Sequence, residues 1–131
     1  MQTVMTKLST AESVATLACT DISQARHYYQ DVLGFDIDDS SPSGYLYVHC
    51  GNDSNLTLYE RRDPPHCDTT QVTFLVQDIA SVMDDLRGRG VTFEEYDLPW
   101  ARTVNGIATQ GGVKASWFKD PCGNILSLTQ M

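Results

Sequence analysis

Apolar and polar residues follow one order of spacings in the first half of the chain, and this order recurs in the second half. In the first half, apolar residues form a short run, then recur every three to four positions, then alternate with polar residues, at 14–19, 22–33, 35–37, 45–48 and 56–59. Alternation predicts strands, and a spacing of three to four predicts an amphipathic helix. The predicted order of this half is β-α-β-β-β.

The second half repeats this order from position 71 onwards. Its predicted elements are a strand, a helix and three further strands, at 71–76, 79–86, 91–96, 113–118 and 124–129. Asp21 and Asp78 precede the two helices as N-caps, and Gly34 and Gly90 follow their last turns, as expected for residues of these types. The two halves differ mainly in a long polar loop at 97–112. Matching order and matching caps indicate two copies of one supersecondary unit.

The repeat predicts an α+β fold in which two tandem βαβββ modules pair and form a curved-sheet cleft. We expect one domain over 1–131, with a first module at 11–60, a Pro-containing linker at 61–70 and a second module at 71–131. A tight hairpin turn is predicted at 120–124, because Pro presets one turn dihedral and Gly tolerates positive φ. A cleft between paired modules is where a small ligand is expected to bind.

The composition of the chain argues against nucleic acid and membrane as partners. The chain carries 17 acidic and 9 basic residues, for a net charge of −8. An acidic chain without a Lys/Arg cluster lacks the electrostatic footprint of a nucleic-acid-binding protein. No apolar run approaches the roughly 18 residues of a membrane span, and the polar N-terminus does not resemble a secretory signal. We therefore expect a cytoplasmic protein that contacts neither membrane nor nucleic acid, with its four widely spaced cysteines reduced.

Three motifs resemble the vicinal oxygen chelate superfamily, which includes glyoxalase I, the bleomycin-resistance proteins and the extradiol dioxygenases. They are DISQARHYYQDVLGF at 21–35, VTFLVQDI at 72–79 and FKDPCGNILSL at 118–128. With the repeat, the resemblance covers about residues 13–130. It implies the glyoxalase/bleomycin-resistance fold and a homodimer, formed by side-by-side packing or by exchange of modules.

The resemblance also implies four positions for metal ligands, on the first and last strand of each module. Here those positions carry Val14, Thr57, Gln71 and Ser127. A catalytic Zn²⁺ needs about three His, Cys or carboxylate ligands, and Mn²⁺ or Fe²⁺ favours His and carboxylate oxygens. Of the four, only Gln71 offers a plausible oxygen ligand. We therefore predict no metal and no other cofactor, and interpret these four residues as part of a ligand-binding surface.

Aromatic residues extend the predicted binding surface. Tyr47, Tyr59 and Trp117 lie on predicted strands, where they either line the cleft or fill the core. Trp100 and Arg102 lie in the 97–112 loop, which could act as a lid over the cleft.

Glu60 ends a predicted strand and is a weak candidate for a general base. The alternative for Glu60 is a solvated charge beside Arg61 and Arg62. His49 and Cys50 are adjacent in the sequence, so their side chains are expected on opposite faces of a strand, too far apart to chelate one ion.

Three functions remain open at this point. The first is a metal-free protein that binds a small apolar or aromatic molecule in the cleft between the modules. The second is an enzyme of the same superfamily, a lyase, isomerase or dioxygenase, which is metal-free or uses a metal through unrecognised ligands. The third is a scaffold whose cleft is filled by its own side chains.

Overall fold

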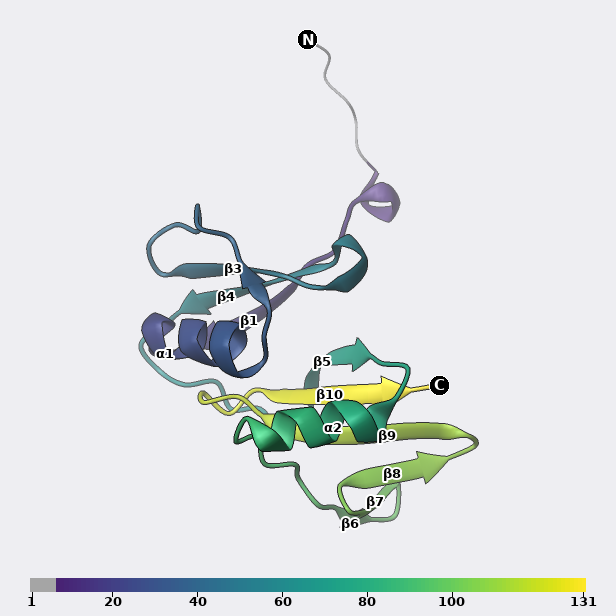
Figure 1. The fold of residues 1–131 in the computed structure, drawn as a ribbon. Helices are drawn as coiled ribbons and strands as arrows, with labels where there is room; N and C mark the ends of the chain where they lie inside the picture. Colours follow the sequence, from purple (N-terminus) through teal and green to yellow (C-terminus); the bar gives the residue numbers. More distant parts are fainter. Residues whose placement is uncertain (1–6) are drawn as a thin grey trace.

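The chain folds into two β-sheets with one helical segment each. A computed structural model describes residues 7–131, beginning with a short 3₁₀ turn at Leu8–Thr10 (Figure 1). The elements of the first half are β1 (Ala15–Cys19), α1 (Ile22–Arg26), β2 (Asp36–Ile37), β3 (Tyr45–His49) and β4 (Asn55–Glu60). A π-helical segment at His27–Val32 continues α1, and a 3₁₀ turn at Gly51–Asp53 joins β3 to β4. The elements of the second half are β5 (Thr70–Leu75), α2 (Ile79–Gly88), β6 (Asp97–Leu98), β7 (Ala101–Val104), β8 (Ile107–Gln110), β9 (Val113–Lys119) and β10 (Ile125–Gln130).

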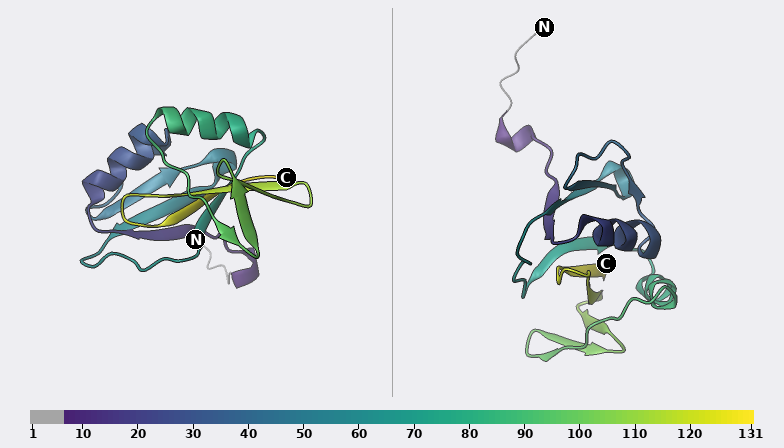
Figure 2. Two further views of the ribbon diagram at one scale, coloured as in Figure 1. Left: turned by 90° about the horizontal axis from the view of Figure 1, so that it is seen from below. Right: turned by 90° about the vertical axis from the view of Figure 1, so that its left-hand side faces the viewer.

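The two sheets have the same connectivity. Their strand orders are β1-β4-β3-β2 and β5-β10-β9-β8-β7-β6, and in each half the first strand pairs in parallel with the last. The outer strands β1 and β5 contact each other, so the sheets meet along these edges. Both helices lie on the same side of the strands (Figure 2, left). The predicted α+β fold of two paired βαβββ modules is confirmed, while the boundaries at 61 and 71 remain a proposal.

The two helices begin with matching hydrogen bonds in the two halves. The Asp21 carboxylate accepts from the backbone N–H of Ser23 at 3.0 Å and of Gln24 at 3.1 Å. In the second half, the Asp78 carboxylate accepts from Ser81 N–H at 3.2 Å. Both predicted N-caps are therefore confirmed.

A second acceptor reaches each helix start from the closing strand of the same half. Ile22 N–H donates to Glu60 Oε2 on β4 at 2.9 Å, and Ile79 N–H donates to Gln130 Oε1 on β10 at 2.8 Å. These contacts satisfy helix N–H groups that have no partner within the helix. The internal repeat thus extends to individual contacts.

The predicted long loop at 97–112 is wrong, because this segment contains β6, β7 and β8. The two tight turns of this segment explain why it forms strands and not the predicted loop. Asn105 and Gly106 have φ of 53° and 82°, and Gly111 and Gly112 have φ of 59° and 82°. Two successive positive φ values match the twist of the flanking strands in a two-residue hairpin, and Asn-Gly is its strongest sequence signal. The strand predicted at 91–96 is reduced to an isolated bridge between Phe93 and Phe118.

One hydrophobic core on the helix side of the sheets serves both halves. Its buried members come from strands and helices of each half: Leu17, Cys19, Ala25, Tyr29, Ile37, Leu46, Val48, Leu56, Leu58, Ile79, Met83, Leu86, Val91, Phe93, Phe118, Leu126 and Leu128. In the strands, these residues alternate with residues on the opposite face, which we call the open face.

The turn between β9 and β10 joins the two halves. The Asp120 carboxylate, 5% exposed, accepts from Tyr29 Oη of the first half at 2.7 Å and from Asn124 Nδ2 at 2.8 Å. Asn124 Nδ2 also donates to the Ala18 carbonyl of β1 at 2.8 Å. Burial and the Asp120 charge raise the pKa of Tyr29 well above its ordinary value, so its hydroxyl stays a donor. The predicted hairpin turn is confirmed, with Gly123 at φ of 90°.

Candidate functional site

A cavity of about 580 Å³ lies on the helix side, between the two halves. From the first half it is lined by Leu33, Phe35, Cys50, Gly51, Asn52 and Ser54, and from the second by Thr73, Phe74, Leu75, Val76, Val82, Asp85, Leu86, Phe118 and Leu128. Its volume falls in the range of about 300–1,000 Å³ that is typical of ligand pockets. The space between the halves is therefore large enough for a small organic molecule.

Apolar side chains from both halves form most of the cavity wall. The rings of Phe35 and Phe74 lie 5.3 Å apart, centroid to centroid, with a tilt of 31° across the junction of the halves. Val82 and Leu86 contribute from α2, and Phe118 contributes from β9. Aromatic rings favour offset or tilted contacts with other rings. This wall is suited to a flat apolar or aromatic molecule.

The turn between β3 and β4 supplies polar groups at one end of the cavity. Asn52 lines it with a left-handed backbone at φ of 54°, and the neighbouring Asp53 has φ of 58°. The Ser54 hydroxyl donates to the Gly51 carbonyl, which leaves its oxygen as an acceptor. Burial raises the pKa of the Cys50 thiol, so it stays neutral at neutral pH. This end offers hydrogen bonds without a full charge.

Charge in the lining is confined to one acid. Asp85, on α2, has its Oδ2 at 3.2 Å from Arg89 Nε on the exposed surface. Among the described lining residues there is no Lys, Arg or His. The walls therefore hold nothing that would neutralise an anionic ligand.

The residues predicted as ligand-binding lie on other surfaces, and none of the nine lines this cavity. In the first half, Tyr47 pairs with Thr57 across β3 and β4, and Tyr59 follows on β4, all on the open face. Val14, 46% exposed, precedes β1. The strand alternation was predicted correctly, but most of the cavity lining comes from the helix side of the sheet.

The second half places its predicted residues in two separate regions. Ser127 lies between Thr73 of β5 and Trp117 of β9 on the open face. The Trp117 indole N–H donates to Thr70 Oγ1 at 3.2 Å. Trp100 and Arg102 lie at the outermost hairpin of the sheet, four strands from β5, rather than in a lid over the cavity.

The remaining predicted residues have local partners. Gln71 Nε2 donates to the Thr69 carbonyl at 3.2 Å. Glu60 accepts the Ile22 N–H at the start of α1, on the helix side of its strand, and does not line the cavity. Its observed role is helix capping, which gives no support to the general-base hypothesis.

None of the lining residues was among the residues predicted to bind a ligand. Phe35, Phe74 and Leu86 have the spacing of ordinary core residues, and whether such residues meet or leave a gap depends on how the halves dock. The segment Gly51-Asn52-Asp53 gave a weak signal for the polar turn at the cavity, because residues of these types tolerate positive φ.

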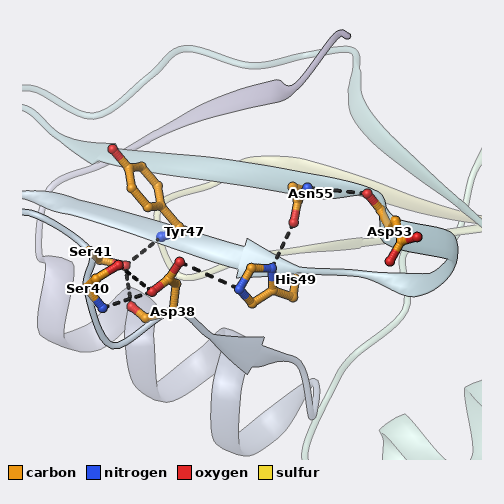
Figure 3. Close-up of polar contacts among 7 residues, drawn as sticks. All are labelled: Asp38, Ser40, Ser41, Tyr47, His49, Asp53 and Asn55. Carbon is orange, nitrogen blue, oxygen red and sulfur yellow. Dashed lines mark hydrogen bonds and ion pairs between the residues drawn. The ribbon is translucent and has the colours of Figure 1, made fainter.

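A polar group on the open face was also missed. His49 Nδ1–H donates to Asn55 Oδ1 at 2.9 Å, and His49 Nε2 lies 3.7 Å from Asp38 Oδ2 (Figure 3). Hydrogen bonds from the Ser40 hydroxyl and N–H lower the pKa of Asp38. His49 is absent from the cavity lining while Cys50 is part of it, so the two adjacent side chains do not meet at one site.

The residues present do not fit the metal site that the fold implies. Val14 has no donor atom, and the other three positions offer only hydroxyls and an amide, of which the Gln71 amide is engaged with Thr69. Within residues 7–131, no three His, Cys, Asp or Glu side chains are grouped so that they could hold an ion.

The comparisons with known proteins give the family. Residues 12–128 match the profile of the Glyoxalase/Bleomycin resistance protein/Dioxygenase superfamily. The chain belongs to this superfamily. The comparison with curated proteins gave no match.

Solved structures of this fold cover nearly the whole chain. A superfamily member from Sphaerobacter thermophilus is 26% identical with a TM-score of 0.66, over 95% of this chain and 100% of that one. TnmS3, an antibiotic binding protein from a Streptomyces species, is 24% identical with a TM-score of 0.62, over 92% and 97%. The oxidase ChaP-H2 is 21% identical with a TM-score of 0.67, over 93% and 94%. The last two likenesses concern the fold alone. No helix in the described part of the chain is long and apolar enough to cross a membrane.

Proposed function

We propose that this protein binds a small, largely apolar or aromatic organic molecule in the cavity between its two halves, without a metal. The observation that carries the proposal is the cavity itself, about 580 Å³ with three phenylalanines in its wall and a polar turn at one end. Binding of this kind depends on apolar burial and a few placed hydrogen bonds. The proposed site lies on the helix side, not on the open face that the sequence favoured.

The relatives guide the choice of ligand. Because TnmS3 is an antibiotic binding protein of the same fold, antibiotics and other aromatic natural products are the first class to test. We also expect a homodimer, which follows from the family resemblance.

A thermal-shift screen with such compounds tests the proposal. A ligand present at about 100 times its Kd adds about 2.7 kcal/mol to the stability of the native state. With an unfolding entropy of about 2.1 cal/mol/K per residue, this raises the Tm by about 10 °C. Val82→Trp should fill the cavity and abolish the shift. Val104→Trp, at a 72% exposed site outside the lining, is the control and should keep it.

Two results would count against the proposal. The first is a screen in which no apolar or aromatic compound raises the Tm. The second is a shift that survives in Val82→Trp, which would place binding elsewhere.

Catalysis is the second candidate, and the contact of His49 with Asp38 and Asn55 favours it. An imidazole held through Nδ1 can transfer a proton at Nε2, which here lies 3.7 Å from the Asp38 carboxylate. If turnover of any compound is found, His49→Gln should abolish it while leaving ligand binding in the cavity unchanged. Unchanged turnover in His49→Gln would remove this candidate.

A further inference from the structure

Within residues 7–131, the cavity lining contains one acidic residue and no basic one. Asp85 carries a negative charge at the rim, and the cations within the described chain lie outside the lining. The chain as a whole has a net charge of −8, which also disfavours an anionic ligand. A carboxylate, sulfonate or phosphate entering the cavity would lose its water, and Arg89, the cation beside the lining, is already paired with Asp85 at 3.2 Å, so the loss is costly.

The only amide side chain among the described lining residues lies at one end of the cavity. Asn52 comes with Ser54 from the turn between β3 and β4; of the other polar lining residues, Thr73 lies on β5 and Asp85 on α2, where Val82 and Leu86 are apolar. Asn52 is exposed, so its amide donors and acceptor can bind a ligand in place of water. Asn52 is held at φ of 54°, a conformation that Asn tolerates better than most residues.

We infer that the ligand is a non-anionic aromatic molecule with a hydrogen-bonding group at one end, and that this end lies against Asn52. The inference rests on the proposed function and specifies its ligand class. Apolar rings contact Phe35 and Phe74, and the polar end meets the turn. Anions with the same ring system are rejected.

Two fluorescent probes that share one skeleton test the charge selectivity. N-phenyl-1-naphthylamine is neutral, and 8-anilino-1-naphthalenesulfonate carries the same rings with an added sulfonate. We expect the neutral probe to bind at least tenfold more tightly at low salt. Asp85→Asn should strengthen binding of the sulfonate several-fold, because Arg89 is then left without its acidic partner. Asp84→Asn makes the same change in net charge outside the lining, and it should have less than a twofold effect.

A second pair of variants tests the position of the polar end. Asn52→Gly removes the amide and keeps a residue that accepts positive φ, and Asp53→Gly is the matched control in the same turn. Asn52→Gly should weaken binding of 1-naphthol about fivefold, the loss expected for one hydrogen bond. It should leave naphthalene unchanged, and Asp53→Gly should affect neither.

The outcomes separate the two proposals. Equal or tighter binding of the sulfonate probe in the wild type, blocked by Val82→Trp, would overturn the charge selectivity and leave the proposed function standing. Equal effects of Asn52→Gly and Asp53→Gly would overturn the assigned orientation. If none of these probes binds although a compound of the thermal-shift screen does, the inferred ligand class fails and the proposed function stands; if no compound of either set binds, both fail.

Discussion

Removal of the Tyr29 hydroxyl tests the junction that holds the two halves beside the cavity. Tyr29 is fully buried, and its hydroxyl donates at 2.7 Å to Asp120, whose carboxylate also accepts from Asn124 and Cys122. A hydrogen bond to a charged group contributes about 1.5–3 kcal/mol. Tyr29→Phe keeps the ring and removes only this bond. We expect a loss of about 2 kcal/mol, equivalent to a fall in Tm of about 7 °C for a chain of this length.

Tyr28→Phe is the matched control for this prediction. Its hydroxyl donates to the neutral Lys119 carbonyl at 3.2 Å and its side chain is only half-buried. We expect a loss of about 0.5 kcal/mol. Urea unfolding of both variants, followed by circular dichroism, measures the difference. Equal losses in the two variants would refute the claim that the buried Tyr29–Asp120 bond joins the halves.

Three further predictions concern the hairpin, a buried thiol and a helix cap. Gly106→Ala should destabilise by about 2 kcal/mol or more, because a Cβ there would meet Met83 at 3.0 Å. Gly112→Ala, with the same φ of 82° and open space, should cost about 1 kcal/mol in the same urea assay. Burial, then nearby negative groups, raise the pKa of Cys19 from 9.0 to about 11. The buried neutral thiol therefore contributes stability that is complete below pH 9 and lost as the pH rises towards 11, at most about 3 kcal/mol. Cys19→Ala should flatten the pH dependence of the Tm over this range, and an unchanged profile would contradict the assignment. Asp78→Ala should cost about 1 kcal/mol in urea unfolding, and no loss would show that the cap is not stabilising.

Local patterns were sufficient to predict most of the fold. The helix caps at Asp21 and Asp78 and the turn before Asn124 depend on contacts within a few residues or within one half, so the sequence contains their signals. The segment 97–112 also carries a local signal, since Asn105-Gly106 is typical of a two-residue hairpin, although the polar composition of the segment predicts a loop.

The site depended on information that a single strand or helix does not contain. Alternation indicated correctly that Tyr47, Thr57 and Ser127 share the open face, but it could not show on which side the docked halves leave a space. Phe35 and Phe74 meet across the junction from opposite halves, and nothing in either local segment predicts that contact. Cavities between modules are a property of docking, which the periodic pattern does not specify.

The accessibility of Cys50 tests the central claim most directly, because this thiol lines the cavity. Alkylation of each cysteine can be followed by peptide mass spectrometry, with and without the ligand that gives the largest thermal shift, in protein treated with a chelator. Cys67, half-buried and outside the lining, is the internal reference. The account predicts that the ligand slows alkylation of Cys50 at least tenfold and leaves Cys67 unchanged. Equal rates at Cys50 with and without ligand, or protection that disappears with the chelator, would contradict a metal-free binding site between the two halves.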